Sequence, residues 1–111
     1  MVSAFDDREK NYEAKWAHDE DLRFRTVARR NKLLGLWAAE QFGLTGAAAE
    51  SYAQELLSLE VHGARDEDIA QKLQDDFTAR GIAISSHAIS RRMEQLLAEA
   101  GEQVMHETKK T

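Results

Sequence analysis

Four histidines are the residues of this chain best suited to hold a metal ion or to transfer a proton near neutral pH. Their spacing is not that of metal ligands, and no HExxH sequence is present. The chain contains no cysteine, which excludes thiolate metal sites, disulfides and thiol nucleophiles. We therefore expect no metal site and no cofactor. The histidines are His18, His62, His87 and His106.

The residues that could carry out acid–base or phosphate chemistry are also poorly arranged for it. Asp75 and Asp76 are adjacent in a predicted helix, where neighbouring side chains point in different directions, so we interpret them as solvated rather than as a catalytic pair. Neither GxxxxGK[ST] nor GxGxxG occurs, and no serine or threonine lies in a recognisable nucleophile motif. We predict that the chain is not an enzyme.

An aromatic stripe at the front of the chain is the strongest indication of function. Phe5, Tyr12 and Trp16 lie in a segment otherwise made mainly of charged residues. At about 100° per residue, these three positions share one narrow sector of a helix. The sector is too thin to form a core of its own. We expect residues 1–18 to be disordered or partly helical when free, and to insert into a larger partner.

A basic run follows this segment and allows three interpretations. Between Arg23 and Lys32 there are five basic residues and no acid. The run could be a solvated face that pairs with Asp19 and Asp21, a docking surface for an acidic protein, or a nucleic-acid contact. The formal net charge of −5 argues against nucleic acid as the main partner. The basic residues are Arg23, Arg25, Arg29, Arg30 and Lys32.

The elements that must position these residues are helices. Proline is absent, and residues that favour helix are abundant. Acids, serine or threonine at the starts and glycines at the ends predict four helices. Their expected limits are about 19–42, 46–60, 66–80 and 86–106, with Asp66 as one cap and Ser85 or Ser86 as another. The first should present Phe24, Val27, Ala28, Leu34, Ala38 and Phe42 on its apolar face.

These signals predict an all-α protein, an antiparallel four-helix bundle with a mobile, helix-capable N-terminal segment. We expect residues 1–18 to form the partner-binding segment, 19–106 the bundle and 107–111 a frayed tail. Ile82 to Ile84 is the one candidate strand, and it is too short for a sheet. No stretch reaches the 18 apolar residues of a membrane span, and no signal peptide is recognisable, so we expect a cytoplasmic protein.

The front of the chain closely resembles the zeta inhibitor subunit of alphaproteobacterial F-type ATP synthases. The resemblance is carried by FDDREK at 5–10, EAKWAHDE at 13–20, LRF at 22–24 and, above all, ARRNKLLGLWAA at 28–39. It continues more loosely to the final helix. Tyr12 and Trp16 stand where the family usually has phenylalanine, and the C-terminus runs on by about ten residues.

The resemblance implies a non-catalytic subunit that blocks ATP hydrolysis, peripheral to the inner membrane through the synthase. In that family the N-terminal segment enters a catalytic α/β interface next to the rotor γ subunit, and the bundle stays outside. We expect partner contacts from Phe5, Asp6, Asp7, Arg8, Lys10, Tyr12, Lys15 and Trp16, and weaker contacts from Arg29, Arg30 and Lys32. The alternatives are a helical nucleic-acid-binding module using residues 23–32 and a membrane-surface helix at residues 5–17.

Overall fold

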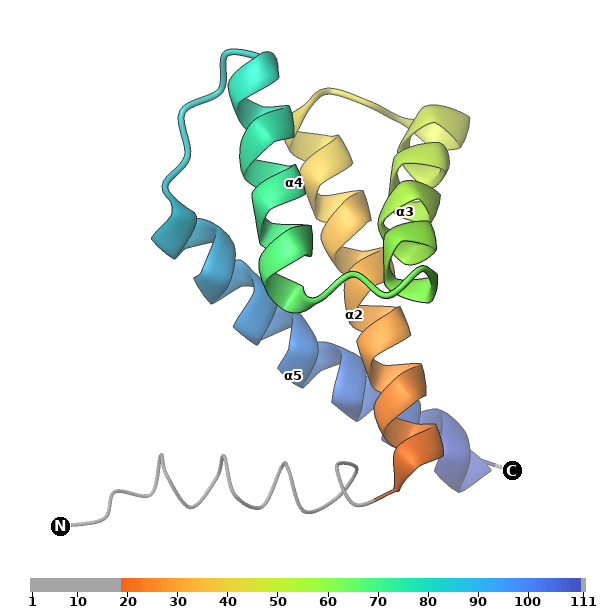
Figure 1. Ribbon diagram of the computed structural model, residues 1–111. Helices are drawn as coiled ribbons and strands as arrows, with labels where there is room; N and C mark the ends of the chain where they lie inside the picture. The colour runs from red at the N-terminus through yellow and green to blue at the C-terminus, as the bar shows by residue number, and fades with distance from the viewer. Residues whose placement is uncertain (1–18, 111) are drawn as a thin grey trace, which may run out of the picture.

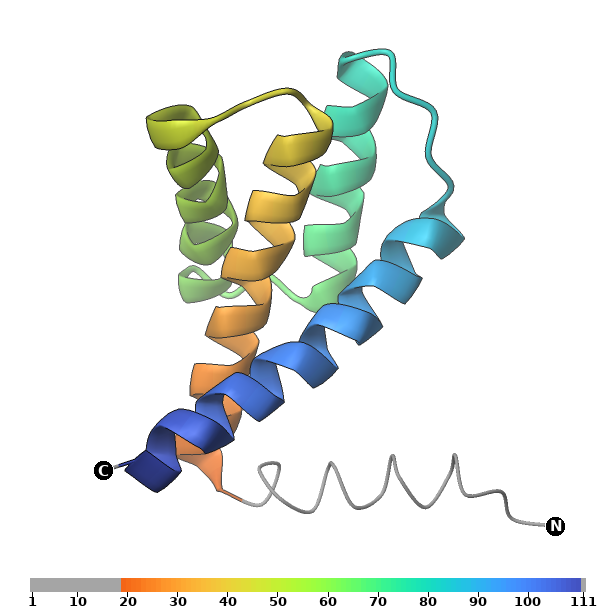
Figure 2. The same cartoon turned by 180° about the vertical axis from the view of Figure 1, so that it is seen from behind.

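A computed structural model describes residues 19–110 as four α-helices. They are α2 (Glu20–Gln41), α3 (Gly46–Val61), α4 (Asp66–Ala79) and α5 (Ser86–Lys110). Successive helices run in alternating directions, and α2 lies at the centre, in contact with α3 and α5 (Figures 1 and 2). Helix α5 crosses α2 obliquely, so that its C-terminal half lies beside the first half of α2. The predicted all-α, antiparallel four-helix fold is confirmed for this part of the chain.

Side-chain caps start three of these helices. The Asp19 carboxylate accepts the Leu22 N–H at 3.2 Å, and Ser85 Oγ accepts the Ala88 N–H at 3.0 Å. At α4 the N-cap is Arg65 rather than the expected Asp66, and its N–H donates to Asp68 at 2.9 Å. The reason is that a carboxylate three residues into the helix satisfies the Arg65 N–H, which leaves Asp66 inside the first turn.

Glycines close the helices where the sequence predicts. Gly43 and Gly81 take φ values of 80° and 71°, which side chains disfavour. The segment from Ile82 to Ile84 forms no strand; instead both isoleucines pack against the core. Helix α5 continues to Lys110, so residues 107–110, which we expected to be a frayed tail, are helical.

The core lies between the four helices, where Leu34, Leu56, Leu73 and Ile89 are fully or almost fully buried. Phe42 packs edge to face against Phe77 with ring centroids 4.8 Å apart, and the Trp37 ring is tilted at 42° to Phe77 with centroids 5.6 Å apart. Within residues 19–110, all four helices contribute buried residues to the core. The bundle therefore has a hydrophobic core of its own.

The predicted apolar face of α2 is wrong at its first turns. Phe24 is 67% exposed, whereas Thr26, Arg30 and Asn31 are buried. The physical reason is the length of α2, which extends past the ends of α3 and α4 (Figure 1), so these two helices do not bury the first turns, in which Phe24 lies.

Helices α2 and α3 approach closely at Gly35. A Cβ placed on Gly35 would lie 2.5 Å from the Cα of Ala53 and 3.1 Å from its Cβ. A glycine in mid-helix lowers helix propensity, and here it permits a close crossing of two backbones. The contact fixes α3 against the centre of α2, which places Leu57 one turn further along α3 beside the basic half of α2.

Candidate functional site

The main predicted site lies outside the described residues. Residues 1–18 include all of the expected inhibitory set, so the positions of its members relative to the bundle are not described. That set is Phe5, Asp6, Asp7, Arg8, Lys10, Tyr12, Lys15 and Trp16. What the structure does describe is the helix that follows them and the basic run that it carries.

Helix α2 begins at the junction with a well-formed but uncovered first turn. Asp19 is extended, with φ −107° and ψ 113°, and its side chain caps the helix. Glu20 and Asp21 in the first turn complement the positive end of the helix dipole. Asp21 and Arg25 are 3.7 Å apart, an i,i+4 pair that the sequence predicts. The side chains are exposed, so the pair contributes little to stability.

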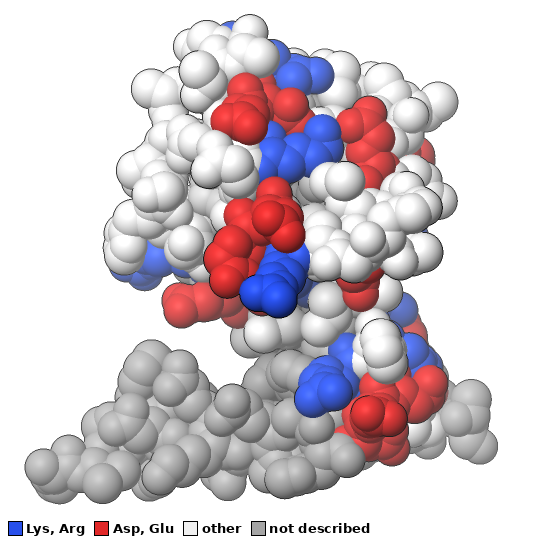
Figure 3. All heavy atoms as spheres, viewed as in Figure 1, with Lys and Arg blue, Asp and Glu red and all other residues white. Residues whose placement is uncertain are grey.

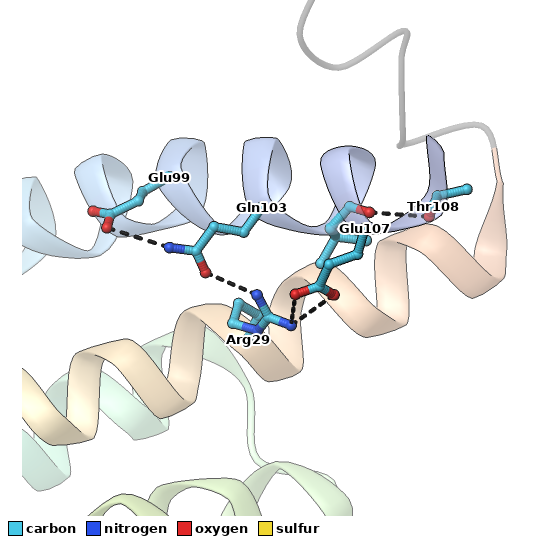
Figure 4. A network of polar contacts seen from close by, with 6 residues as sticks. Arg29, Glu99, Gln103, Glu107 and Thr108 are labelled. Atoms are coloured by element: carbon cyan, nitrogen blue, oxygen red, sulfur yellow. Dashed lines mark hydrogen bonds and ion pairs between the residues drawn. The ribbon is translucent and has the colours of Figure 1, made fainter. Parts of the chain in front are cut away.

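Arg29 joins the basic run to the end of the chain (Figure 4). Its Nη2 donates to both carboxylate oxygens of Glu107, at 2.8 and 2.7 Å, and its Nη1 donates to Gln103 Oε1 at 2.8 Å. Gln103 in turn donates to Glu99 at 3.4 Å. The Arg29 side chain is 27% exposed, so its ion pair is partly shielded from water. We call Arg29, Gln103 and Glu107 the α2–α5 clasp.

Arg30 lies in the interior rather than on an exposed stripe. Only 2% of it is exposed; its Nε donates to Asn31 Oδ1 at 2.8 Å and its Nη2 to Asp66 Oδ1 at 2.7 Å. Asn31 Nδ2 donates to Glu60 at 3.1 Å. The network ties α2 to the start of α4 and the end of α3. A buried guanidinium with these partners serves packing, so Arg30 is a poor candidate for partner contact.

Lys32 is exposed and lines a groove between three helices. The groove has a volume of about 290 Å³, and its lining residues come from α2, α3 and α5. Its rim is basic and its floor apolar, and no acid is among its lining residues. They are Arg25, Ala28, Arg29, Lys32, Leu57 and Val104. We call this the α2–α3–α5 groove.

A second, larger hollow lies between α4 and α5. Its volume is about 450 Å³, and Ile89, Met93 and Leu97 supply apolar lining opposite the polar side chains of α4. Arg30 reaches it, but the guanidinium is already bonded to Asp66. Acidic side chains border it on both sides, Glu67 on α4 and Glu94 on α5.

A polar network between α3 and α4 holds Asp76, one of the two adjacent acids in α4. Tyr52 donates to Asp76 at 2.6 Å, and Lys72 donates to Asp76 at 2.9 Å and lies 3.1 Å from Glu55. Burial opposes ionisation of Asp76, but these two hydrogen bonds hold its pKa below the ordinary value. Burial, and then the bond to Asp76, raises the pKa of Tyr52. Asp75 bonds only to Gln71.

The three histidines that the structure describes are exposed, and one of them, His62, also contacts the backbone. His62 Nδ1 lies 2.7 Å from the Ser58 carbonyl oxygen at the end of α3, and His87 and His106 are exposed. Over the described range, no three acidic or histidine side chains converge on a point where a metal ion would fit. None of the helices within residues 19–110 has the length and apolar character needed to cross a bilayer.

Three of the five basic residues of the run bond to acids of the same chain. The pairs are Arg25 with Asp21, Arg29 with Glu107 and Arg30 with Asp66. Acidic and basic side chains also alternate on the face shown in Figure 3, with no broad area of one sign. Nucleic-acid binding needs an uninterrupted basic footprint, so this arrangement does not favour that alternative.

Sequence reasoning missed two features of this region. It did not find the exposed Val61, 81% of which is accessible, or the role of Glu107. It also placed Arg30 among partner contacts, although a signal against this was present. Arg30 and Asn31 lie four and three residues before Leu34, on the helix face that Leu34 buries.

A comparison with protein-family models supplies the identity. The model described as ATPase inhibitor subunit zeta matches residues 1–103, which includes the leading segment, helices α2 to α4 and most of α5. No curated protein gives a significant match to the chain. The family description is that of a regulatory subunit acting on an ATPase, which fits a chain whose polar clusters are structural. The match covers nearly all of the 111 residues, and the chain belongs to the ATPase inhibitor subunit zeta family.

Proposed function

We propose that this chain inhibits ATP hydrolysis by an F-type ATP synthase by inserting residues 1–18 at a catalytic α/β interface beside the rotor. Phe5, Tyr12 and Trp16 are the anchors, and Arg8, Lys10 and Lys15 set the register through charge-assisted contacts. Asp6 and Asp7 start the inserted helix. Rotation in the hydrolysis direction is blocked, and rotation in the synthesis direction expels the segment.

The observation that carries the proposal is the extent of the family match. It spans residues 1–103, so the segment that carries the aromatic stripe lies within the matched region together with the helices. A stripe of three large rings among charged residues is typical of a helix that binds in an apolar groove.

The bundle supports this division of roles. Helices α2 to α5 bury apolar side chains against one another. Helix α2 begins at Asp19 with its own cap. A body of this kind can hold the inhibitory segment at the mouth of its binding site while remaining outside, and its linkage raises the local concentration of the segment.

The test is a hydrolysis and synthesis assay on a related synthase. The full chain should inhibit hydrolysis and leave synthesis largely unaffected. Deleting residues 1–18, or the substitution Trp16→Ala, should abolish most of the inhibition. Trp16→Phe is the matched control, because it keeps an aromatic ring at the same position and should retain inhibition. Full inhibition by the deletion variant would disprove the proposal.

A further inference from the structure

The two large hydrophobic side chains that the described residues leave exposed each lie one helical turn from a residue that lines the α2–α3–α5 groove. Phe24 precedes Ala28 by four residues on α2, and Val61 follows Leu57 by four residues on α3. Side chains four apart share a helix face, and α2 and α3 run antiparallel, so both extend the groove in the same direction. Phe24 and Val61 are 67% and 81% exposed. We call Phe24, Val61 and the α2–α3–α5 groove together the apolar strip.

The strip has the dimensions of a helix-binding surface. From Phe24 to Lys32 it follows α2 for eight residues, or about 12 Å, which matches roughly two turns of a docked helix. Apolar side chains on neighbouring helices provide the floor, and long basic side chains flank it. A groove of this pattern is suited to an amphipathic helix whose polar side carries acids.

The charges favour an acidic occupant. Arg25, Arg29 and Lys32 line the groove with no acid among the lining residues. Glu107 engages Arg29, and Asp21 lies 3.7 Å from Arg25, but Lys32 has no ion-pair partner within residues 19–108. An acidic side chain on the occupant would meet Lys32 first.

The position of the strip indicates where the occupant comes from. Phe24 lies only five residues, about 8 Å along α2, from Asp19, where the inhibitory segment joins the bundle. Any protein that holds residues 1–18 must therefore lie within reach of the strip.

We infer that Phe24, Val61 and the α2–α3–α5 groove form a second contact site, which binds an acidic amphipathic helix of the catalytic sector of the synthase. The inference rests on the proposed function for the identity of the partner. Compared with the weaker contacts expected from the sequence, this site adds Phe24, Val61 and Arg25 and leaves out Arg30. Arg29 and Lys32 belong to both sets. The site increases the lifetime of the complex, whereas residues 1–18 block rotation.

The experiment uses the full chain and measures two quantities, direct binding to the isolated catalytic sector and the concentration for half-maximal inhibition of hydrolysis. The test variant is Phe24→Ser combined with Lys32→Glu, and both positions are exposed, so the fold should tolerate the changes. The expected result is an affinity at least tenfold weaker, with unchanged inhibition at saturation. The affinity of the wild-type chain should fall with salt more steeply than that of the variant.

Arg91→Glu is the matched control for charge reversal. Arg91 is exposed on α5, thirteen residues or about 20 Å along the helix from Val104. This variant should bind and inhibit as the wild-type chain does. Equal affinity of the test variant and the wild-type chain would overturn the inference. If the wild-type chain binds without inhibiting, the proposed function is refuted, and the affinity of the groove variant still tests the second site. If the wild-type chain does not bind, both the proposed function and the second contact site are contradicted.

Zero-length carbodiimide coupling, which joins a lysine amine to a carboxylate in contact with it, identifies the occupant. Coupling of Lys32 to an acidic peptide from the catalytic sector supports the inference. Coupling to residues 6–13 of the same chain, or to a second copy of the chain, assigns the groove to a different occupant and overturns it.

Discussion

Arg29 and Glu107 form an ion pair between residues 78 positions apart, with one guanidinium nitrogen 2.7–2.8 Å from both carboxylate oxygens. Through this pair the last turns of α5 hold the first half of α2, the part of the bundle that directly follows residues 1–18 in the sequence. Gln103 adds a third bond to the same guanidinium. The C-terminal extension is therefore a structural part of the bundle at Glu107.

The α2–α5 clasp should contribute a measurable coupling energy. We expect Arg29→Gln and Glu107→Gln each to lower the free energy of unfolding by about 0.5–1 kcal/mol, because the pair is charge-assisted but partly exposed. A double-mutant cycle by urea denaturation should give a coupling of similar size. The coupling should decrease in high salt. Strict additivity of the two substitutions would show that the pair adds nothing to stability.

Arg30 should be a stability residue. Arg30→Ala removes a buried side chain and leaves Asn31 Oδ1 without its donor, so we expect a loss of about 2–3 kcal/mol in unfolding free energy. Arg23→Ala is a control, since Arg23 is exposed on the same helix and should change stability by less than about 0.5 kcal/mol. At saturating concentration, the folded Arg30→Ala chain should still inhibit. Wild-type stability in this variant would contradict the structure of the network.

Gly35 should resist substitution by the best helix former. On an open helix face, Gly→Ala gains about 1 kcal/mol, but here the new Cβ would lie 2.5 Å from the Ala53 Cα. We expect Gly35→Ala to destabilise the bundle by about 1–3 kcal/mol, because α2 and α3 must separate. Adding Ala53→Gly should rescue only part of the loss, since the closest atom belongs to the backbone. A more stable Gly35→Ala chain would show that the two helices are not held so closely.

Asp76 should make stability depend on acid pH. Its pKa lies below the ordinary 3.8 in the folded chain, so its contribution is complete above that value and is lost as the pH falls through the lowered pKa. We expect Asp76→Asn to cost about 1–2 kcal/mol at pH 7 and less at pH 3. Urea denaturation at the two pH values measures the difference. Asp75→Asn makes the same charge change next to it and should have little effect at pH 7, because Asp75 is exposed. Equal costs at both pH values would contradict the prediction.

The helices could be predicted from sequence because local signals mark their ends. Acids and serine cap the starts, and Gly43 and Gly81 close α2 and α4 in conformations that other residues disfavour. The alternating direction of the helices follows from the short connections between them. These features depend on neighbours in the sequence, so no knowledge of the packing is needed to find them.

The exposed and buried side chains of α2 could not be predicted in the same way. Periodicity shows that Phe24 and Ala28 share a face, but it does not show that α3 and α4 end before that face reaches Phe24. The pairing of Arg29 with Glu107 depends on the oblique course of α5, which no local pattern records. The groove between three helices follows from the same tertiary arrangement.

The separate start of α2 at Asp19 has a mechanical consequence. Because this residue is extended and caps the helix, tension on the preceding chain is transmitted to the bundle through one peptide unit at the tip of α2. From there the load passes along α2 to Arg29 and is shared with α5, so that two helices resist it in parallel. The exposed turns of α2 between Asp19 and Arg29 are therefore the part of the bundle that carries such a load alone.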